Sequence, residues 1–430
     1  MIPISPLRGA LAGRTLPDMA DSLAARRFIL QLARALHQHG TPANRLEAAL
    51  TAAARQLGLK AEFFSTPTSI MVGIGDVEQQ HVHLLRVEPG EPNLGQLARL
   101  GEVTRRVVEG EIAPTEGLAL IDAMDREPPV YKPWLVVLAF VLASAAVACF
   151  LRVRAGDVVI ASFLGLITAA VSLSTSRFES TRHITEPLAA FVVTTMAFAF
   201  DGVMRSGNGF LTSLAGLVIL MPGLTFTVAL SELSTRHLAS GTARMSGALV
   251  TFLGLGFGLA LGAKTGVVLE HILREQVPGA AQFSWTTPLP AWTEWAALLV
   301  APLAFTVLLN GPPRDAPLIV LACAAAYLTS KFAGATYGEE LGAFLGALVV
   351  SAGSNVFARV KRRVAMVTQV PGLLILVPGS VGFRSVQSLL GQEIETGIQT
   401  GFRVAIIGIS LAAGMLAGNV VTRATNRIRV

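Results

Sequence analysis

Hydrophobic positions divide the chain into two parts with different spacing. Between residues 26 and 128, apolar residues recur every three or four positions in two stretches and then alternate in three short runs. This order predicts two amphipathic helices, three β-strands and two closing helices, which together form a small cytoplasmic α+β domain. The expected strands cover residues 61–65, 69–74 and 81–87. Residues 1–25 lack the continuous apolar core of a signal peptide, so we expect a flexible N-terminus there.

Beyond Pro128-Pro129 the pattern changes to long apolar runs. Ten of these runs are long enough to cross a bilayer, which takes about 20 residues. They cover residues 133–151, 156–175, 186–204, 209–231, 245–263, 292–310, 316–332, 339–357, 364–382 and 402–421. Residues 264–291 are too polar to span and should form an external loop, and residues 422–430 should form a cytoplasmic tail. The pattern therefore predicts an α-helical polytopic membrane protein with ten transmembrane helices.

The composition supports this division. Of the 430 residues, 52% are hydrophobic and 14% are charged, whereas soluble domains carry about 25% charged residues. This excludes an ordinary cytosolic enzyme. Residues 1–132 hold 14 Lys and Arg and 15 Asp and Glu, against 20 and 13 in residues 133–430. The basic excess lies in short loops between spans, so it indicates membrane orientation and not nucleic-acid binding.

Orientation follows from one basic cluster in particular. Residues 359–363 contain Arg359, Lys361, Arg362 and Arg363, and such clusters favour the cytoplasmic side. We therefore expect both termini in the cytoplasm, with the chain in the bacterial inner membrane.

The spans contain an internal repeat. Pro222-Gly223 lies in the fourth apolar run and Pro371-Gly372 in the ninth, so residues 133–263 and 292–421 read as two five-span repeats. An odd number of spans makes the second copy enter the membrane with opposite orientation, and such inverted repeats with interrupted spans are typical of secondary transporters. The interruption predicts unwound backbone near the midplane, where a half-helix N-terminus favours a substrate carboxylate. A simple proline kink is the alternative.

Several short motifs together resemble the threonine/serine exporter family. They include the stretches Gly40-Thr41-Pro42-Ala43-Asn44-Arg45-Leu46-Glu47 and Pro67-Thr68-Ser69-Ile70, then Pro222-Gly223-Leu224, Glu232, Ser240-Gly241 and Arg244, and finally Asn355, Arg359, Pro371-Gly372-Leu373 and Val377-Pro378-Gly379-Ser380. Two departures stand out. Glu232 replaces the more usual Asp, and Val364-Ala365 stands where a proline is usual. The resemblance implies antiport-type export of threonine and serine driven by the proton gradient, with no other cofactor. Relatives whose two halves are separate chains are associated with succinate export, so a dicarboxylate remains an alternative substrate.

The candidate site residues follow from the repeat and the resemblance. The substrate-binding candidates are Pro222, Gly223, Asn355, Gln369, Pro371, Gly372 and Arg403. The proton-coupling candidates are Asp201 and Glu232, since ionisable groups inside a membrane are costly and need a reason. Each has an ordinary alternative: Asp201 marks the end of its span, Arg403 anchors an external edge, and Asn355 and Gln369 bond neighbouring helices.

Other chemistry is not indicated. No Walker motif is present, which argues against ATP as the driving force. The pairs His37/His39 and His81/His83 lack the further ligands of a metal site. No Ser/His/Asp or Cys/His set occurs at a spacing that indicates nucleophilic catalysis. We therefore expect no enzyme activity and no metal. The expected partners are the amino acid substrate and the lipid bilayer, and we expect no nucleic-acid partner. The sequence is compatible with a homo-oligomer. A membrane-anchored sensor or enzyme acting through the N-terminal domain is the competing hypothesis.

Overall fold

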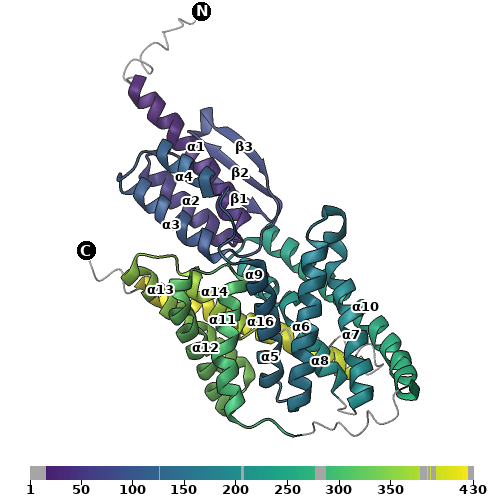
Figure 1. Ribbon diagram of the computed structural model, residues 1–430. Helices are drawn as coiled ribbons and strands as arrows, with labels where there is room; N and C mark the ends of the chain where they lie inside the picture. The colour runs from purple at the N-terminus through teal and green to yellow at the C-terminus, as the bar shows by residue number, and fades with distance from the viewer. Residues whose placement is uncertain are drawn as a thin grey trace, which may run out of the picture. The chain divides into compact units, whose positions relative to one another are not determined.

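The computed structural model (Figure 1) describes residues 16–124, 126–204, 208–276, 287–377 and 394–424, together with Ser385 and Ser388. The chain divides into two compact units, Met1–Pro128 and Pro129–Val430. We call them the N-terminal unit and the membrane unit. The boundary falls at the Pro128-Pro129 pair, where no regular element is formed.

The N-terminal unit packs four helices against one face of a three-stranded sheet (Figure 1). Its elements are α1 (Leu16–Gln38), α2 (Ala43–Gln56), β1 (Ala61–Thr66), β2 (Ser69–Ile74), η1 (Val77–Gln79), β3 (His81–Arg86), α3 (Leu94–Val108) and α4 (Pro114–Met124). The strands are antiparallel in the order β1-β2-β3. The alternation of side chains buries Ile70, Val72 and Ile74 of β2 against Phe28 and Leu46 of the helices. This is the α+β arrangement that the spacing of hydrophobic positions predicts.

One helix of this unit begins earlier than expected. The helix α1 starts at Leu16, within the stretch for which we expected a flexible N-terminus up to residue 25. Pro17 is tolerated in a first helical turn because the amide hydrogen there has no intrahelical partner. A signal peptide needs a continuous apolar core, but a helix does not. The lack of such a core in residues 1–25 therefore did not indicate a flexible chain.

The C-terminal end of α3 carries an exposed ion-pair network. Arg105 bonds Glu102 at 2.9 Å and Glu111 at 2.7 Å, and it also contacts Glu109. The hydrogen bonds from Arg105 lower the pKa of Glu102 and of Glu111 below the ordinary value. A lowered folded-state pKa means that the contacts stabilise the unit above the unfolded pKa and are lost as the pH falls through the folded one.

The membrane unit is helical throughout its described part. Its elements are α5 (Pro133–Phe150), α6 (Ala155–Thr175), η2 (Glu179–Ile184), α7 (Thr185–Met204), α8 (Gly209–Leu217), η3 (Val218–Leu220), α9 (Gly223–Ser234), α10 (Leu238–Gln276), α11 (Trp292–Leu308), η5 (Pro313–Asp315), α12 (Ala316–Tyr337), α13 (Glu339–Lys361), α14 (Met366–Leu374) and α16 (Ile394–Ala424).

Several of these helices can cross a membrane. Six are long and apolar enough, a seventh span arises if the bent pair of Gly209–Leu220 and Gly223–Ser234 counts as one, and Trp292–Leu308 is a shorter apolar helix. The chain is therefore a polytopic membrane protein. The ten-span count stays a prediction. Among the described residues, α14 has only nine residues, and α7 is not one of the helices that are both long and apolar enough to cross a membrane.

Helix packing follows the same scheme in the two halves. In the first half α5 packs on α6, α6 and α7 both pack on α8, and α7 packs on α10. In the second half α11 packs on α12, α12 and α13 both pack on α14, and α13 packs on α16. The two halves meet where α5 lies against α11.

One expected loop is helical over much of its length. The helix α10 continues to Gln276, thirteen residues into the stretch 264–291 that we expected to be an external loop. Residues 264–276 are too polar to lie in lipid, but they contain no proline, so the helix propagates beyond the apolar segment. Residues 277–286 lie outside the described part of the chain.

Glycines allow the closest helix contacts in both halves. A Cβ atom built on Gly262 of α10 would lie 2.6 Å from the Phe191 carbonyl oxygen of α7. A Cβ atom built on Gly414 of α16 would lie 2.2 Å from the Phe344 carbonyl oxygen of α13. Neither distance can be accommodated without separating the backbones, so small residues set the spacing of these helix pairs.

This leads to a test with a control on the same helix. Changing Gly262→Ala should lower the stability of the detergent-solubilised chain by about 1–3 kcal/mol, because the added methyl group overpacks the α7–α10 contact. Changing Gly247→Ala, where a Cβ meets nothing within 4 Å, should be neutral or stabilising since alanine favours a helix. Thermal unfolding of both variants measures this; equal midpoints would contradict the packing role.

Candidate functional site

The helix break at Pro222 is the most distinctive feature of the membrane unit. The segments Gly209–Leu220 and Gly223–Ser234 are bent by 56° where they meet. Met221 has extended backbone, with φ −71° and ψ 128°, and Pro222 then precedes the first residue of α9. Proline supplies no amide hydrogen and cannot continue the preceding helix, so the chain turns here and starts a new one.

The new helix presents donors at the break. The first amide groups of any helix lack intrahelical acceptors, and the helix dipole makes that end favourable for an anion. Pro222 and Gly223 are both buried. The Phe226 amide already bonds the Pro222 carbonyl at 2.9 Å, and the Thr227 hydroxyl bonds the Gly223 carbonyl at 3.0 Å. The amides of the first turn of α9 are therefore the backbone donors at the break that are suited to an anion.

The second Pro-Gly motif is placed differently. Pro371 and Gly372 lie inside α14, which continues through them and ends at Leu374. The expected interruption thus does not fall at Pro371 itself but at the end of the helix a few residues later. The motif residues Pro378, Gly379 and Ser380 lie outside the described residues.

Both segments nevertheless reach the same pair of helices. Ile219, just before the first break, packs against a cluster formed by residues of α5 and α11 that includes Ala139 and Ala304. Ile375, just after α14, packs against a second cluster on α5 and α11 that includes Ala146 and Ala301. The structure therefore brings both segments against the α5–α11 contact between the two halves, at levels that are seven residues apart along α5.

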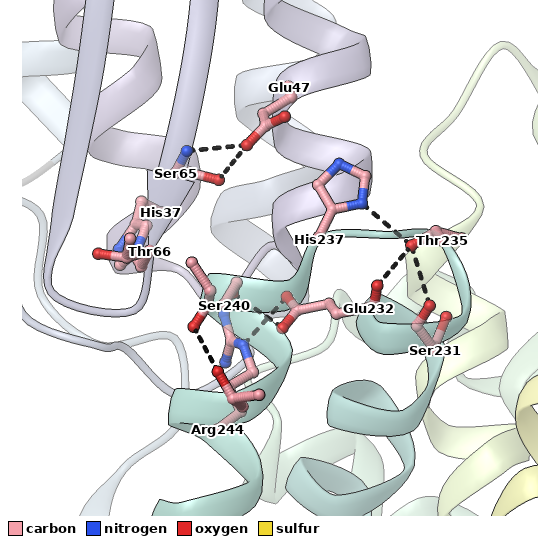
Figure 2. A network of polar contacts seen from close by, with 12 residues as sticks. His37, Glu47, Ser65, Thr66, Ser231, Glu232, Thr235, His237, Ser240 and Arg244 are labelled. Carbon is pink, nitrogen blue, oxygen red and sulfur yellow. Dashed lines mark hydrogen bonds and ion pairs between the residues drawn. The ribbon is translucent and has the colours of Figure 1, made fainter.

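Glu232 forms a buried ion pair near the end of α9. Its side chain is 0% exposed, accepts a hydrogen bond from the Ser240 hydroxyl at 2.8 Å, and binds the Arg244 guanidinium at 3.1 Å (Figure 2). Ser240 and Arg244 both belong to α10. The pair therefore fastens the half-helix that begins at the break to the helix that follows it.

The turn between α9 and α10 adds more polar contacts. The Thr235 hydroxyl bonds the Ser231 carbonyl at 2.9 Å and the imidazole Nδ1 of His237 at 3.1 Å (Figure 2). Arg236 takes the left-handed conformation with φ 65°, which reverses the chain. The Ser231 hydroxyl is buried without a hydrogen-bond partner among the described residues. Ser231 directly precedes Glu232 in α9, and its hydroxyl is a further candidate for contact with a solute.

Asp201, the second proton-coupling candidate, lies in another polar cluster. Its Oδ1 accepts the Asn208 amide at 3.0 Å, while the Asn208 side chain donates to Asp157 at 2.6 Å. Asp157 is 1% exposed and also accepts the Arg154 amide at the start of α6. Sequence reasoning missed Asp157, although an acidic residue in the first turn of a helix is a recognisable capping signal.

The polar candidates of the second half bond neighbouring helices. Gln369 of α14 is buried and donates to the Ser351 hydroxyl of α13 at 2.8 Å. Asn355 of α13 donates to Asn419 of α16 at 2.8 Å and to the Thr422 hydroxyl at 3.1 Å. These contacts are those of the helix-bonding alternative. Asn355 follows Ser351, the partner of Gln369, by four residues, which is about one turn of α13.

Arg403 is at an exposed edge. Its guanidinium lies 3.1 Å from the Glu339 carboxylate and 3.9 Å from that of Glu340. The exposed fractions of the side chains are 51% for Arg403, 60% for Glu339 and 41% for Glu340. The seven substrate-binding candidates are thus not gathered in one place. Pro222 and Gly223 lie at the break, and Gln369, Pro371 and Gly372 lie in α14. Asn355 lies in α13, about one turn from the Gln369 partner Ser351, and Arg403 lies at its exposed edge.

Two further ion pairs in the membrane unit escaped the sequence analysis. Asp315, before α12, is buried and bonds Arg363, which precedes α14. Glu294, at the start of α11, binds Arg152 at 3.0 Å and the Tyr327 hydroxyl at 2.7 Å, and it also contacts Lys331. Both join helices that are far apart in sequence, so only the packing reveals them.

The N-terminal unit has a small polar cluster of its own. Glu47 accepts hydrogen bonds from the Ser65 amide at 2.8 Å and the Ser65 hydroxyl at 2.9 Å, and His37 Nε2 lies 2.9 Å from the Thr66 carbonyl (Figure 2). His81 and His83 have exposed side chains on β3. Among the described residues no group of three or more His, Cys, Asp or Glu side chains is placed to hold a metal ion.

Comparison with known proteins gives family matches over most of the chain. Residues 27–266 match the family model described as "Putative threonine/serine exporter", and residues 294–421 match the one described as "Threonine/Serine exporter, ThrE". The first of these matches alone covers more than half of the 430 residues. No solved structure matches the chain.

The curated relatives that the chain matches come from fungi, and several of them are named as membrane proteins. The chain is 28% identical over 381 residues to "Pheromone-regulated membrane protein 10" of Saccharomyces cerevisiae, covering 86% of this chain and 48% of the relative. It is 28% identical over 378 residues to the protein of the same name in Candida albicans, covering 85% and 34%. It is 24% identical over 403 residues to "Uncharacterized protein C7D4.12c" of Schizosaccharomyces pombe, covering 90% and 50%. The chain spans about half or less of the length of these relatives.

The buried pair Glu232–Arg244 leads to a stability test. Changing Arg244→Ala leaves the Glu232 carboxylate buried without its cation, which in general costs about 3–5 kcal/mol. Changing Arg403→Ala removes an exposed pair and should cost less than about 1 kcal/mol. Thermal unfolding of the two variants in detergent should therefore show a large loss for the first and little change for the second. Similar midpoints for both would mean that the Glu232 pair does not fasten α9 to α10.

Proposed function

The chain belongs to the threonine/serine exporter family, and from that premise we propose that it exports threonine and serine across the bacterial inner membrane as a proton-coupled secondary transporter. The family assignment rests on the two matched regions, which together include both halves of the membrane unit. The fungal relatives are membrane proteins too, and they carry no substrate in their names.

The observation that carries the proposal is the helix break at Pro222. It lies in the fourth segment of one half, and its two sides pack on helices of the other half, Ile219 on α11 and α9 on α16. The matching helix pairs of the two halves favour an inverted repeat. In transporters of that construction, substrate binds at the repeat interface beside a half-helix N-terminus.

The chemistry of an amino acid fits the groups near this break. The α-carboxylate would accept hydrogen bonds from the free amides at the start of α9. Gln369 of α14 and Ser351 of α13 are buried, and they can exchange their mutual hydrogen bond for one to the substrate hydroxyl. A dicarboxylate such as succinate fits the first group equally well but supplies no hydroxyl for the second.

Proton coupling needs a carboxylate that can change partners. Glu232 meets this need because it lies at the end of the half-helix that begins at the break and is held by Arg244 and Ser240. If α9 moves relative to α10, the carboxylate loses its cation and takes up a proton, since an unpaired buried charge is costly. Asp201 is the second candidate, although its bond to the Asn208 amide suits a capping role.

Orientation rests on the two ends of α13. Its last turn carries Arg359 and Lys361, and Arg362 follows, whereas its first turn carries Glu339 and Glu340. The basic end favours the cytoplasm. This orientation sets the N-terminal unit in the cytoplasm, where it would gate the inner mouth or gather substrate.

Transport by proteoliposomes tests the proposal. The purified chain should move labelled threonine and serine when a pH gradient is imposed, and collapse of the gradient should abolish the accumulation. Succinate, tested in parallel, decides the dicarboxylate alternative. Absence of flux for all three solutes would remove the proposed function and favour a sensor or enzyme that acts through the N-terminal unit.

A matched pair of proline variants in the same assay tests the break itself. Changing Pro222→Ala restores an amide hydrogen and lets α8 and α9 join, so threonine flux should fall at least tenfold while the protein still inserts. Changing Pro302→Ala is the control, because Pro302 is buried inside the continuous helix α11. Equal flux of the two variants would refute the assignment of the site to the break.

A further inference from the structure

The outer face of the sheet in the N-terminal unit is apolar at its centre and exposed. The register sets Phe64 of β1 beside Met71 of β2, and Met71 beside Leu84 of β3, so the three side chains form one row across the sheet. Their exposed fractions are 50%, 43% and 66%. Val82 adds a further side chain on the same face with 65% exposure. Contiguous exposed apolar surface of this kind usually marks a place where another surface binds.

Charges occupy two opposite corners of this face. One neighbouring row consists of Glu62, Gly73 and Val82, and the other consists of Thr66, Ser69 and Arg86. Glu62 and Arg86 thus lie on different edge strands and at opposite ends of those strands, and both are exposed. A face with an acidic corner, a basic corner on the diagonal and an apolar centre is complementary to itself.

We propose that this outer face binds the same face of a second copy of the chain. A two-fold axis in the plane of the interface, along the diagonal through Val82 and Thr66, brings Met71 against its own symmetry mate. The same axis brings Glu62 of each copy against Arg86 of the other, which forms two identical ion pairs at the rim. The strands of the two sheets then cross at near right angles, which is one of the two common ways in which sheets stack.

The charge pattern selects this arrangement over aligned stacking. With the two-fold axis parallel to the strands, Glu62 would face Val82 of the second copy, and with the axis across the strands it would face Thr66. Neither arrangement pairs the charges. In the orthogonal arrangement both corners are neutralised while the row Phe64–Met71–Leu84 is covered.

The size of the face sets the conditions for a test. Three strands of six residues make a surface of about 14 Å by about 20 Å, which is smaller than the roughly 800 Å² that each partner buries in a standard stable interface. The association should therefore be weak for dilute protein in detergent. Confinement of both copies to one membrane raises their effective concentration and favours pairing.

Cross-linking of the full chain in membranes with a thiol-specific reagent measures the pairing. The background has Cys149 and Cys323 replaced by serine, and Met71→Cys is added. Because Met71 faces its symmetry mate across sheets that stack about 10 Å apart, a short bifunctional maleimide that bridges the two thiols should give a covalent dimer, whereas a direct disulfide needs Cα atoms within about 7 Å. The control Gln56→Cys lies on exposed α2 surface away from the sheet face and should give at least fivefold less. Equal cross-linking at the two positions would overturn the proposal.

Charge reversal then tests the predicted partners. In the Met71→Cys background, Glu62→Arg alone and Arg86→Glu alone should each lower the dimer fraction severalfold, because like charges meet at both rim sites. The double variant Glu62→Arg/Arg86→Glu restores both pairs and should recover the cross-linking. These positions are exposed, and unchanged unfolding midpoints would show that the unit still folds. Single reversals without effect, or a double variant that fails to recover, would contradict the pairing.

Discussion

A helix that breaks inside a bilayer leaves backbone amides without partners, and protein or enclosed water has to satisfy them. The membrane unit meets this constraint at Pro222. Extended backbone at Met221 separates two helices that differ in direction by 56°. Pro222 and Gly223 are buried at the break, and Ile219 just before it packs where α5 of one half meets α11 of the other. An ordinary residue in place of Pro222 would restore the missing amide hydrogen and avoid the cost of an interrupted span, which is why the proposed function assigns the site to this break.

Contacts on both sides of the break hold it in position. Before it, Ile219 packs on α5 and α11, so the end of η3 is fixed against both halves. After it, α9 is fastened to α10 through the buried pair Glu232–Arg244 and packs on α16. A Cβ atom added to Gly408 of α16 would lie 2.7 Å from the ring of Phe226, so that contact also depends on a glycine. A change of partner at Glu232 would thus act directly on the half-helix to which the proposed function assigns substrate binding.

Much of the fold follows from the hydrophobic pattern, and the pairings do not. Strands at residues 61–74 and the helices of the membrane unit were predictable because burial imposes a period of two or a long apolar run. The prediction of a loop at 264–291 was wrong for residues 264–276, which continue helix α10. Polar residues disfavour contact with lipid, but they do not prevent a helix. Glu232 was predicted as a candidate, but its bond to Arg244 depends on how α9 folds back on α10. The contact of Asp157 with Asn208, which are 51 positions apart, has no signal in the local sequence.

The central claim is that the break at Met221-Pro222 faces a solute and not sealed packing. Reactivity of a Met221→Cys variant toward a membrane-impermeant thiol reagent, in a background without Cys149 and Cys323, tests it most directly. The account predicts labelling in membranes, and slower labelling when threonine is present. A cysteine that stays unreactive from both sides of the membrane, in a protein that still transports threonine, would contradict it.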